Sequence, residues 1–218
     1  MVLPPVIPAI FIKRLNRFVG EIFLEGRKQK ALIRNTGKLE ELLKPYNTVF
    51  VRKKLKGKYL YEILIAKAEK GLVCIESNYA GKLFEEYVRE NWKFSILKRE
   101  VKIGNRRIDF LIDDKLVEVK SVNLVKKGVA MFPDAPTKRG KEHIENLIRF
   151  SGKYKPLLVF VVQREDFEEF RPNCETDPDF CKAFYKYINM GFEAIVLRCK
   201  VCLGEIKVVE KLNFYGKT

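Results

Sequence analysis

Three side chains that could form a catalytic site fall within residues 107–121: the carboxylates of Asp109 and Glu118 and the amine of Lys120. Apolar and polar residues alternate on both sides of Asp113-Asp114, which predicts a β-hairpin that turns at those two residues. In that register Asp109 lies directly across from Glu118, with Lys120 on the same face. Opposed side chains have Cβ atoms about 4.5–5.5 Å apart, so the two carboxylates would repel each other unless a cation or a proton lay between them.

A divalent metal ion would remove this repulsion. Mg²⁺ takes one or two carboxylates, keeps several waters and shares its remaining positions with substrate phosphates. We therefore expect Asp109 and Glu118 to hold Mg²⁺ or Mn²⁺, while Lys120 orients the attacking water or neutralises charge on the phosphate. The alternative is a solvated hairpin with a surface charge cluster. Apolar residues on both faces of the hairpin favour a covered position and hence metal-dependent hydrolysis of a phosphodiester.

The spacing of these residues, Asp-x8-Glu-x-Lys, resembles the motif of the PD-(D/E)xK nuclease superfamily. The resemblance implies that the Asp and the Glu hold the metal and that the Lys assists the attacking water. Periodicity after residue 78 predicts a helix, three strands, a helix and a strand, at 78–88, 94–103, 107–112, 116–122, 137–150 and 157–162. This α-β-β-β-α-β order is that of the superfamily core. A further helix at 179–190 and a hairpin at 194–209 follow.

The composition favours a polyanionic partner. The chain has 218 residues, and its 43 Lys and Arg against 28 Asp and Glu give a net charge of +15 and a pI of about 9.6. We expect the partner to be DNA, bound with little sequence preference because no base-reading helix motif is present. Charged residues make up 33% of the chain, so a thermophile surface with ion-pair networks is the alternative. Such networks balance their signs, whereas this chain has a positive excess.

The first 77 residues predict a small all-β domain, an OB-like barrel that binds nucleic acid. Short strands alternate with turns, and only Leu39–Leu43 is predicted to be helical. With 16 Lys and Arg against 7 Asp and Glu, a net of +9, this segment should contribute most of the electrostatic binding. Its densest basic run contains Arg52, Lys53, Lys54, Lys56 and Lys58, followed by Tyr59 and Tyr61 as candidates for base stacking. A solvated turn is the alternative. We expect two domains, residues 1–77 and 78–218, the second an α/β domain.

The apolar segment at residues 2–12 is too short and too rich in proline to span a membrane, and it lacks the leading charge of a secretory signal. We therefore expect a soluble cytoplasmic protein. Four of the five cysteines fall late in the chain: Cys174, Cys181, Cys199 and Cys202. They could bind zinc, form disulfides or remain buried thiols, and the lack of a His partner and the wide spacing favour the latter two.

Five blocks of sequence carry a more specific resemblance. They are NTGKLEELLKP, KREVKIGNRRIDFLI, VEVKSVNL, FPDAPTKRGKEH and VFVVQRED. These blocks extend over most of the chain. Because of them, the chain resembles the sugar fermentation stimulation protein family, also called SfsA. The resemblance implies an OB-like first domain, a restriction-endonuclease-like second domain, non-specific DNA binding and a regulatory role in sugar metabolism. It matches Asp109, Glu118 and Lys120 to the family's Asp, Glu and Lys.

The chain departs from the family pattern at two places. Ile33-Arg34 replaces Cys-Pro, and Glu76-Ser77 replaces Asn-Thr, so the departures concern the first domain and its contacts with the second. Glu86 matches a Glu of the family's first nuclease-domain helix, which implies a further metal ligand. A plain surface position on the helix is the alternative.

Several basic residues near the candidate site could bind phosphate. Lys138, Arg139 and Lys141 lie at the start of the helix after residue 137, where free backbone N–H groups and the helix dipole favour an anion. Helix solubility is the alternative. Arg107 lies on the hairpin. The single histidine, His143, has no obvious partner on that helix, and we expect no role for it.

Two functions follow from these residues. The first is a metal-dependent DNA endonuclease or exonuclease that uses Asp109, Glu118 and Lys120. The second is a non-catalytic DNA-binding regulator of sugar metabolism that keeps the nuclease frame. A third class, a sugar-responsive regulator, is disfavoured because no aromatic platform for a sugar is evident.

Overall fold

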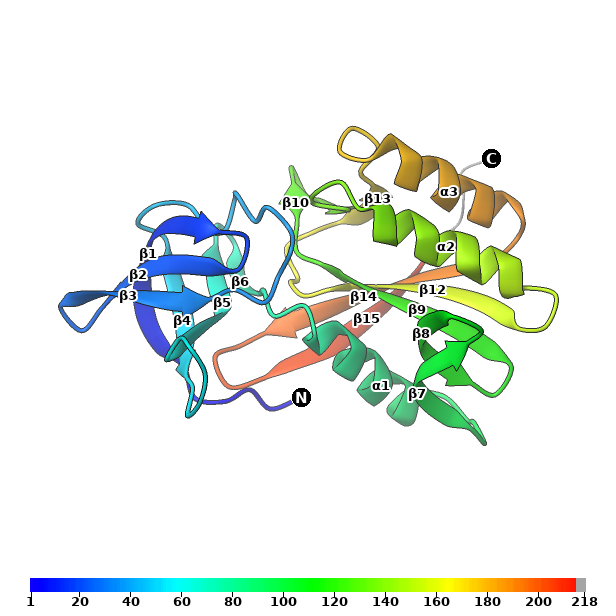
Figure 1. Cartoon of the computed structure of the whole chain (residues 1–218), viewed down its shortest axis with the longest axis horizontal. Coiled ribbons are helices and arrows are strands. Elements are labelled where there is room, and N and C mark those ends of the chain that lie inside the picture. Colours follow the sequence, from blue (N-terminus) through cyan, green and yellow to red (C-terminus); the bar gives the residue numbers. More distant parts are fainter. Residues whose placement is uncertain (215–218) are drawn as a thin grey trace.

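The computed structural model describes residues 1–214 and consists of a small β-barrel joined to a larger α/β unit (Figure 1). The first residues of the chain lie against the larger unit. The backbone N–H of Leu3 donates to the carbonyl of Gly204 (2.9 Å), and the Leu3 side chain is buried in the core of that unit. No helix among the described residues is long and apolar enough to cross a membrane.

The barrel contains six strands: β1 (Ile7–Asn16), β2 (Val19–Leu24), β3 (Arg27–Leu32), β4 (Thr48–Lys53), β5 (Tyr61–Ala68) and β6 (Gly71–Cys74). Their order is β3-β2-β1-β4-β5-β6, and a parallel pairing of β3 with β5 closes the barrel. Alternating inward residues such as Phe11, Ile22 and Ile63 fill the interior. The predicted OB-type barrel is therefore confirmed.

The helix predicted at Leu39–Leu43 is wrong. This segment forms one turn, in which the N–H of Leu43 donates to the carbonyl of Leu39 (2.7 Å). Leu39 has a φ of 55°, in the left-handed region, and therefore cannot begin a right-handed helix. Its N–H instead donates to Oδ2 of Asp134 in the larger unit (2.8 Å). A contact between the two units thus fixes the turn.

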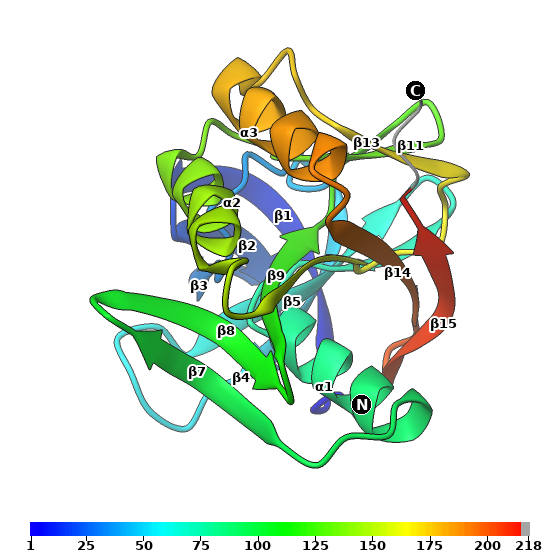
Figure 2. The same cartoon turned by 90° about the vertical axis from the view of Figure 1, so that its right-hand side faces the viewer.

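The larger unit is a six-stranded sheet with helices on both faces (Figure 2). Its strands, in the order β15-β14-β12-β9-β8-β7, are Ile206–Asn213, Glu193–Val201, Lys155–Val162, Lys115–Val122, Arg106–Ile112 and Leu97–Ile103. Helix α1 (Tyr79–Asn91) packs on one face, and α2 (Lys138–Phe150) and α3 (Pro178–Asn189) pack on the other. The predicted α-β-β-β-α-β order is present. Three short strands, β10 (Val125–Lys126), β11 (Val129–Phe132) and β13 (Glu169–Pro172), form an additional sheet that was not predicted.

The central strands are parallel, and burial on both faces explains why they are apolar. Strand β12 pairs in parallel with both β9 and β14, and every residue from Pro156 to Val162 is buried between the two helical layers. Side-chain caps fix the starts of the helices on one face. Thr137 accepts the N–H of Gly140 (3.0 Å) at α2, and Asp177 accepts the N–H of Phe180 (2.9 Å) at α3.

The late cysteines do not form a common site. Cys174 and Cys181 are joined by a disulfide, whereas Cys199 is a buried thiol whose pKa is raised by burial, and Cys202 is an exposed thiol. No cluster of three or more His, Cys, Asp and Glu side chains that could hold a metal occurs in the described part of the chain. Of the alternatives, the structure therefore contains one disulfide and two thiols.

The two departures from the family pattern contact each other at the junction of the barrel and the α/β unit. The carbonyl of Arg34 accepts the N–H (3.1 Å) and the hydroxyl (2.7 Å) of Ser77, and the Arg34 guanidinium lies 3.7 Å from Glu76. Close by, the side chain of Asn35 in the barrel donates to that of Asn123 in the larger unit (2.8 Å).

Candidate functional site

The predicted hairpin is present, but its strands separate where the candidate site begins. Residues 110–112 of β8 pair with residues 115–117 of β9 in the expected register, and the ladder ends before Asp109 and Glu118. The Asp109 carboxylate lies in the gap, where Oδ2 accepts the backbone N–H of Val119 (2.8 Å). Asp109 and Glu118 are therefore not a paired rung of the ladder, contrary to the prediction. The structure links them indirectly, because Asp109 accepts the backbone N–H of the residue that follows Glu118 on β9.

Glu118 is the buried centre of the site. Its side chain is 1% exposed, and its Oε1 accepts a hydrogen bond from Nζ of Lys120 (2.6 Å) and contacts Nδ1 of His143. Its second oxygen, Oε2, is buried without a hydrogen-bond partner among residues 1–214. A buried carboxylate oxygen without a partner costs free energy, so it is a position that a cation would satisfy.

The basic groups around Glu118 have lowered pKa values. Burial lowers the pKa of Lys120 to about 8, an effect that Asp109 opposes and Arg139 adds to. Burial also lowers the pKa of His143, again against the effect of Asp109. The Arg139 Nε donates to Nε2 of His143 (3.1 Å), while Nδ1 of His143 contacts Glu118 and lies 2.9 Å from Nζ of Lys120.

The involvement of His143 contradicts the expectation that it has no role. It lies on the same face of α2 as the buried residues Gly140, Ile144 and Leu147. A helical spacing of three or four residues from an apolar position was therefore the available signal that His143 faces the sheet. The strand across which α2 packs, β9, carries Glu118.

The other predicted site residues divide into two groups. Arg139 reaches the site through His143, whereas Lys141 lies 3.5 Å from Asp179 on α3. Lys138 is exposed beside Arg139. Arg107 is exposed on the β7–β8 hairpin and lies 3.6 Å from Glu100.

Glu86, the implied third metal ligand, is not brought to this cluster. Its carboxylate is 45% exposed and lies 2.9 Å from the amino group of Met1. Its neighbour Glu85 is the buried carboxylate of this helix, and it pairs with Arg89 (2.7 Å) and Arg99. Of the three predicted metal ligands, Asp109 and Glu118 therefore remain as candidates, with Asp109 bound to the backbone of the residue after Glu118.

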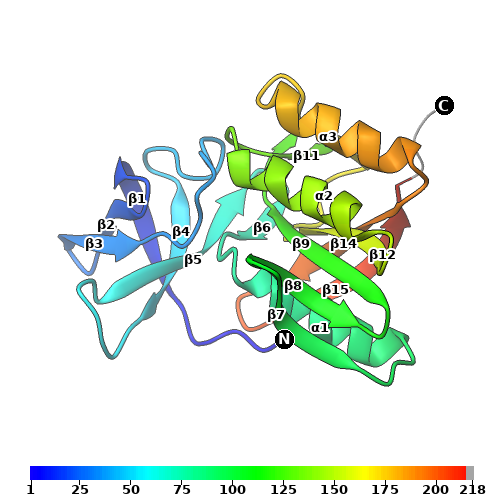
Figure 3. The ribbon, with the colours of Figure 1, turned by 45° about the vertical axis from the view of Figure 1, so that its right-hand side comes forward.

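The basic run of the barrel forms the loop between β4 and β5, at the lower left in Figure 3. Lys53, Lys56 and Lys58 are exposed there. Arg52 differs, because its guanidinium pairs with the fully buried Glu62 (2.9 Å) and is only 30% exposed. Tyr61 belongs to the barrel core, so it is not a free stacking residue.

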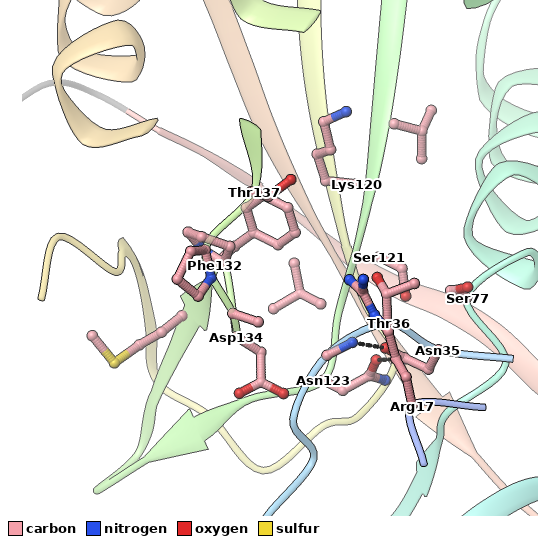
Figure 4. Close-up of a pocket in the computed structure, with 17 residues that line it drawn as sticks. Arg17, Asn35, Thr36, Ser77, Lys120, Ser121, Asn123, Phe132, Asp134 and Thr137 are labelled. Atoms are coloured by element: carbon pink, nitrogen blue, oxygen red, sulfur yellow. Dashed lines mark hydrogen bonds between the residues drawn. The ribbon is translucent and has the colours of Figure 1, made fainter. Parts of the chain in front are cut away.

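A pocket of about 260 Å³ lies where the barrel meets the α/β unit, beside Lys120 (Figure 4). Its walls come from the β1–β2 loop, the 35–37 loop, strand β9 and the 131–137 loop. The hydrogen bond from Asn35 to Asn123 closes its floor. Asp109 lines a second hollow, and Val119 and Ser121 line both.

Known proteins share the order of an OB domain followed by an α/β domain. Residues 12–75 match the family profile of the SfsA N-terminal OB domain, and residues 78–205 match that of the sugar fermentation stimulation protein RE domain. A sugar fermentation stimulation protein homolog from Aquifex aeolicus is 70% identical over 96% of this chain and 98% of the relative. A homolog from Desulforamulus reducens is 36% identical over 95% and 92% of the two chains.

A solved structure resembles the whole fold. The structure of Pyrococcus furiosus SfsA in complex with Ca²⁺ has a TM-score of 0.85 and 32% identity, and the match covers 97% of this chain and 96% of that one. The resemblance carried by the five sequence blocks is confirmed, as is an OB barrel followed by an α/β domain. This chain belongs to the sugar fermentation stimulation protein family.

Proposed function

We propose that this chain is a largely sequence-independent DNA-binding protein in which Asp109, Glu118 and Lys120 form a divalent-metal site that hydrolyses phosphodiester bonds. The observation that carries the proposal is the buried, unpartnered Oε2 of Glu118, on the strand where the next residue, Val119, donates its N–H to Oδ2 of Asp109. Two carboxylate oxygens with substrate phosphate and water are a sufficient ligand set for Mg²⁺ or Mn²⁺. The Ca²⁺ in the Pyrococcus furiosus relative supports a divalent ion bound by oxygen ligands.

The metal would polarise the scissile phosphate. It would also lower the pKa of water, so that water can act as the nucleophile at neutral pH. The protein's own groups do the rest. Lys120 lies between Glu118 and the junction pocket, so its ammonium can donate to a phosphate oxygen or to the attacking water. His143 contacts Glu118 through Nδ1, and Arg139 donates to Nε2 of His143, so the two hold the carboxylate in one orientation.

DNA binding is supported by charge and by the arrangement of the basic segments. The chain carries +15, and basic side chains lie on the β7–β8 hairpin, at the start of α2 and on the β4–β5 loop. These three segments project on the same side of the molecule, the left side in Figure 2. A backbone phosphate could therefore be contacted on either side of the Lys120 site, without any base being read.

The second candidate is a DNA-binding regulator of sugar metabolism without catalysis. It is favoured by the contacts at Oε1 of Glu118, which Lys120 and His143 already satisfy without a metal. The family name, taken from relatives, points to a regulatory effect on sugar fermentation. In this alternative the site is a structural ion pair within a DNA-binding frame.

A cleavage assay separates the two candidates. Purified protein is incubated with supercoiled, linear and single-stranded DNA in Mg²⁺, Mn²⁺ or EDTA. We expect metal-dependent cleavage by the wild type and by the control Arg149→Ala, which lies in the exposed last turn of α2. Asp109→Asn and Lys120→Ala should be inactive. Intact DNA in every metal would contradict catalysis, and it would favour the regulator if the wild type still binds DNA.

A further inference from the structure

Apart from Lys120, the residues that line the junction pocket have no part in the proposed hydrolysis, yet the pocket is built like a binding site. Its volume of about 260 Å³ is slightly smaller than that of the smallest typical small-molecule sites, which is about 300 Å³. Both units contribute to its walls, and direct hydrogen bonds join them. The N–H of Leu39 donates to Oδ2 of Asp134 (2.8 Å), and Asn35 donates to Asn123 (2.8 Å).

A glycine permits the close approach of these walls. A Cβ atom at Gly37 would lie 2.8 Å from Oδ2 of Asp134, which is too close, and 3.1 Å from Oδ1 of Asn35, which is a tight contact. The loop of the barrel can therefore approach the 131–137 loop this closely only with glycine at this position. The pocket is formed before any ligand arrives.

The polar groups that face the pocket are of mixed kind. Among residues 1–214, the guanidinium of Arg17 has no hydrogen-bond or ion-pair partner and lies 6.0 Å from the ring of Phe18. Ser121 accepts from Gln163 (2.8 Å) and keeps its own proton to donate. The Asp134 carboxylate uses Oδ2 for Leu39, which leaves Oδ1 to accept. Donors and an acceptor thus line one small space.

An aromatic ring completes the lining. Phe132 packs edge-on against Phe180, with ring centres 5.2 Å apart, and its ring also lies along the pocket (Figure 4). A ligand that suits these walls has a flat ring, N–H groups for Asp134 and acceptors for Arg17 and Ser121. A simple anion does not suit them, because Asp134 would repel it. A nucleobase attached to its phosphate has all of these features.

The pocket lies next to the residues of the proposed hydrolytic site. Lys120 and Val119 line the pocket, Val119 also binds the Asp109 carboxylate, and Lys120 binds Glu118. At the other end, Arg17 belongs to the loop between β1 and β2 of the barrel, and Figure 4 shows its side chain extending toward Ser121. A single DNA strand bound to the barrel can therefore pass Arg17, place one base in the pocket and reach Lys120.

We propose that the junction pocket binds one nucleotide of single-stranded DNA, with the base between Phe132 and the 35–37 loop, Arg17 on a backbone phosphate and the next phosphate toward Lys120. This inference rests on the proposed function, and it names the substrate as a single strand. In a duplex the bases are paired and stacked, so filling a one-base pocket would require a nucleotide to be flipped out. A single strand fills it without that cost.

Fluorescence polarisation tests the inference in EDTA, where the oligonucleotides remain uncleaved. A labelled single strand and the duplex of the same sequence are titrated at several salt concentrations. Thr36→Trp fills the pocket from an exposed position on the loop, and Arg17→Ala removes its cation. The control is Arg149→Ala, which removes the same charge from the exposed last turn of α2. Thermal melts establish that each variant is folded.

We expect Thr36→Trp to weaken single-strand binding about 5- to 150-fold, the effect of losing one stacked base, and to change duplex binding less than about twofold. Arg17→Ala should lower the salt slope for the single strand by about 0.7. Arg149→Ala should change neither affinity more than about twofold. If Thr36→Trp and Arg17→Ala both match Arg149→Ala, or weaken both DNAs equally, the inference is overturned while DNA binding stands. A wild type that binds neither DNA overturns the proposed function itself.

Discussion

The ammonium nitrogen of Lys120 lies 2.6 Å from Oε1 of Glu118, and both side chains are buried between β9 and α2. The cation that balances this carboxylate is therefore part of the protein. Repulsion between Asp109 and Glu118 is not the force that calls for a metal, contrary to what their spacing in the sequence suggests. What remains for a metal is the second oxygen of Glu118, which has no partner in the described part of the chain.

Removal of Lys120 alone should be costly. In Lys120→Met, the Glu118 carboxylate stays buried without its cation, and we expect the free energy of unfolding in EDTA to fall by about 3–5 kcal/mol. Adding Glu118→Gln to that variant should recover most of the loss, because no buried charge remains. Urea unfolding measures both, with the half-exposed Lys141→Met as the control. A double variant no more stable than the single one would contradict the pairing.

A second buried carboxylate predicts a pH dependence at the junction of the two units. Glu76 is 2% exposed and Glu62 is fully buried, and Arg34 and Arg52 lie beside them. Burial, together with a hydrogen bond shared with Glu62, raises the pKa of Glu76 to about 7. The folded state therefore holds a proton that the unfolded state has released. The resulting stabilisation is complete below about pH 4.5 and is lost as the pH rises through about 7.

Glu76→Gln should remove this dependence, since its amide keeps the hydrogen bonds without a charge. Relative to wild type, we expect the variant to gain about 1–3 kcal/mol as the pH rises from 5 to 8. Urea unfolding at intervals of pH measures the difference between the two proteins. Glu145→Gln, on the exposed face of α2, should keep the wild-type profile. If the difference in free energy of unfolding between Glu76→Gln and wild type does not change with pH, a group other than Glu76 titrates.

The β4–β5 loop makes a prediction about electrostatics. Replacing Lys53, Lys54, Lys56 and Lys58 by Gln should weaken binding to all DNA sequences alike and reduce the salt slope, by about 1 for each phosphate that the loop no longer neutralises. Arg52→Gln should behave differently, because Arg52 pairs with the buried Glu62, so its removal should lower the melting temperature. DNA titrations at several salt concentrations, with a melt of each variant, measure both. An unchanged slope in the fourfold variant would move the binding surface to the α/β unit.

Local patterns were enough to predict most of the fold. Strand β4 (Thr48–Lys53) is one of the short strands expected in the first 77 residues, and its alternating residues face the barrel core. The hairpin turns at Asp113-Asp114 as expected, because both flanking strands keep a period of two up to the turn. The apolar run at 157–162 predicted a strand, and the structure confirms it as part of β12, which is buried between the two helical layers.

The details of the candidate site depend on packing that local patterns do not encode. His143 meets Glu118 only because α2 crosses β9, at a separation of 25 residues. The capping of Val119 by Asp109 depends on the strands separating at the end of their ladder. Arg52 counted as a free cation in the sequence, whereas the neighbouring strand supplies Glu62. The small sheet was missed because its strands have two to four residues, shorter than the windows in which periodicity is read.

Direct measurement of Mn²⁺ binding tests the central claim that Asp109 and Glu118 hold a divalent metal. Calorimetric titration compares wild type, Asp109→Asn and Glu86→Gln, and thermal melts of the same samples report the linked stability. We predict that the wild type and Glu86→Gln bind Mn²⁺ alike, with an increase in stability of about 2.7 kcal/mol at a hundredfold excess over Kd. Asp109→Asn should bind none. Equal binding by Asp109→Asn and wild type, or no binding by the wild type, would contradict the account.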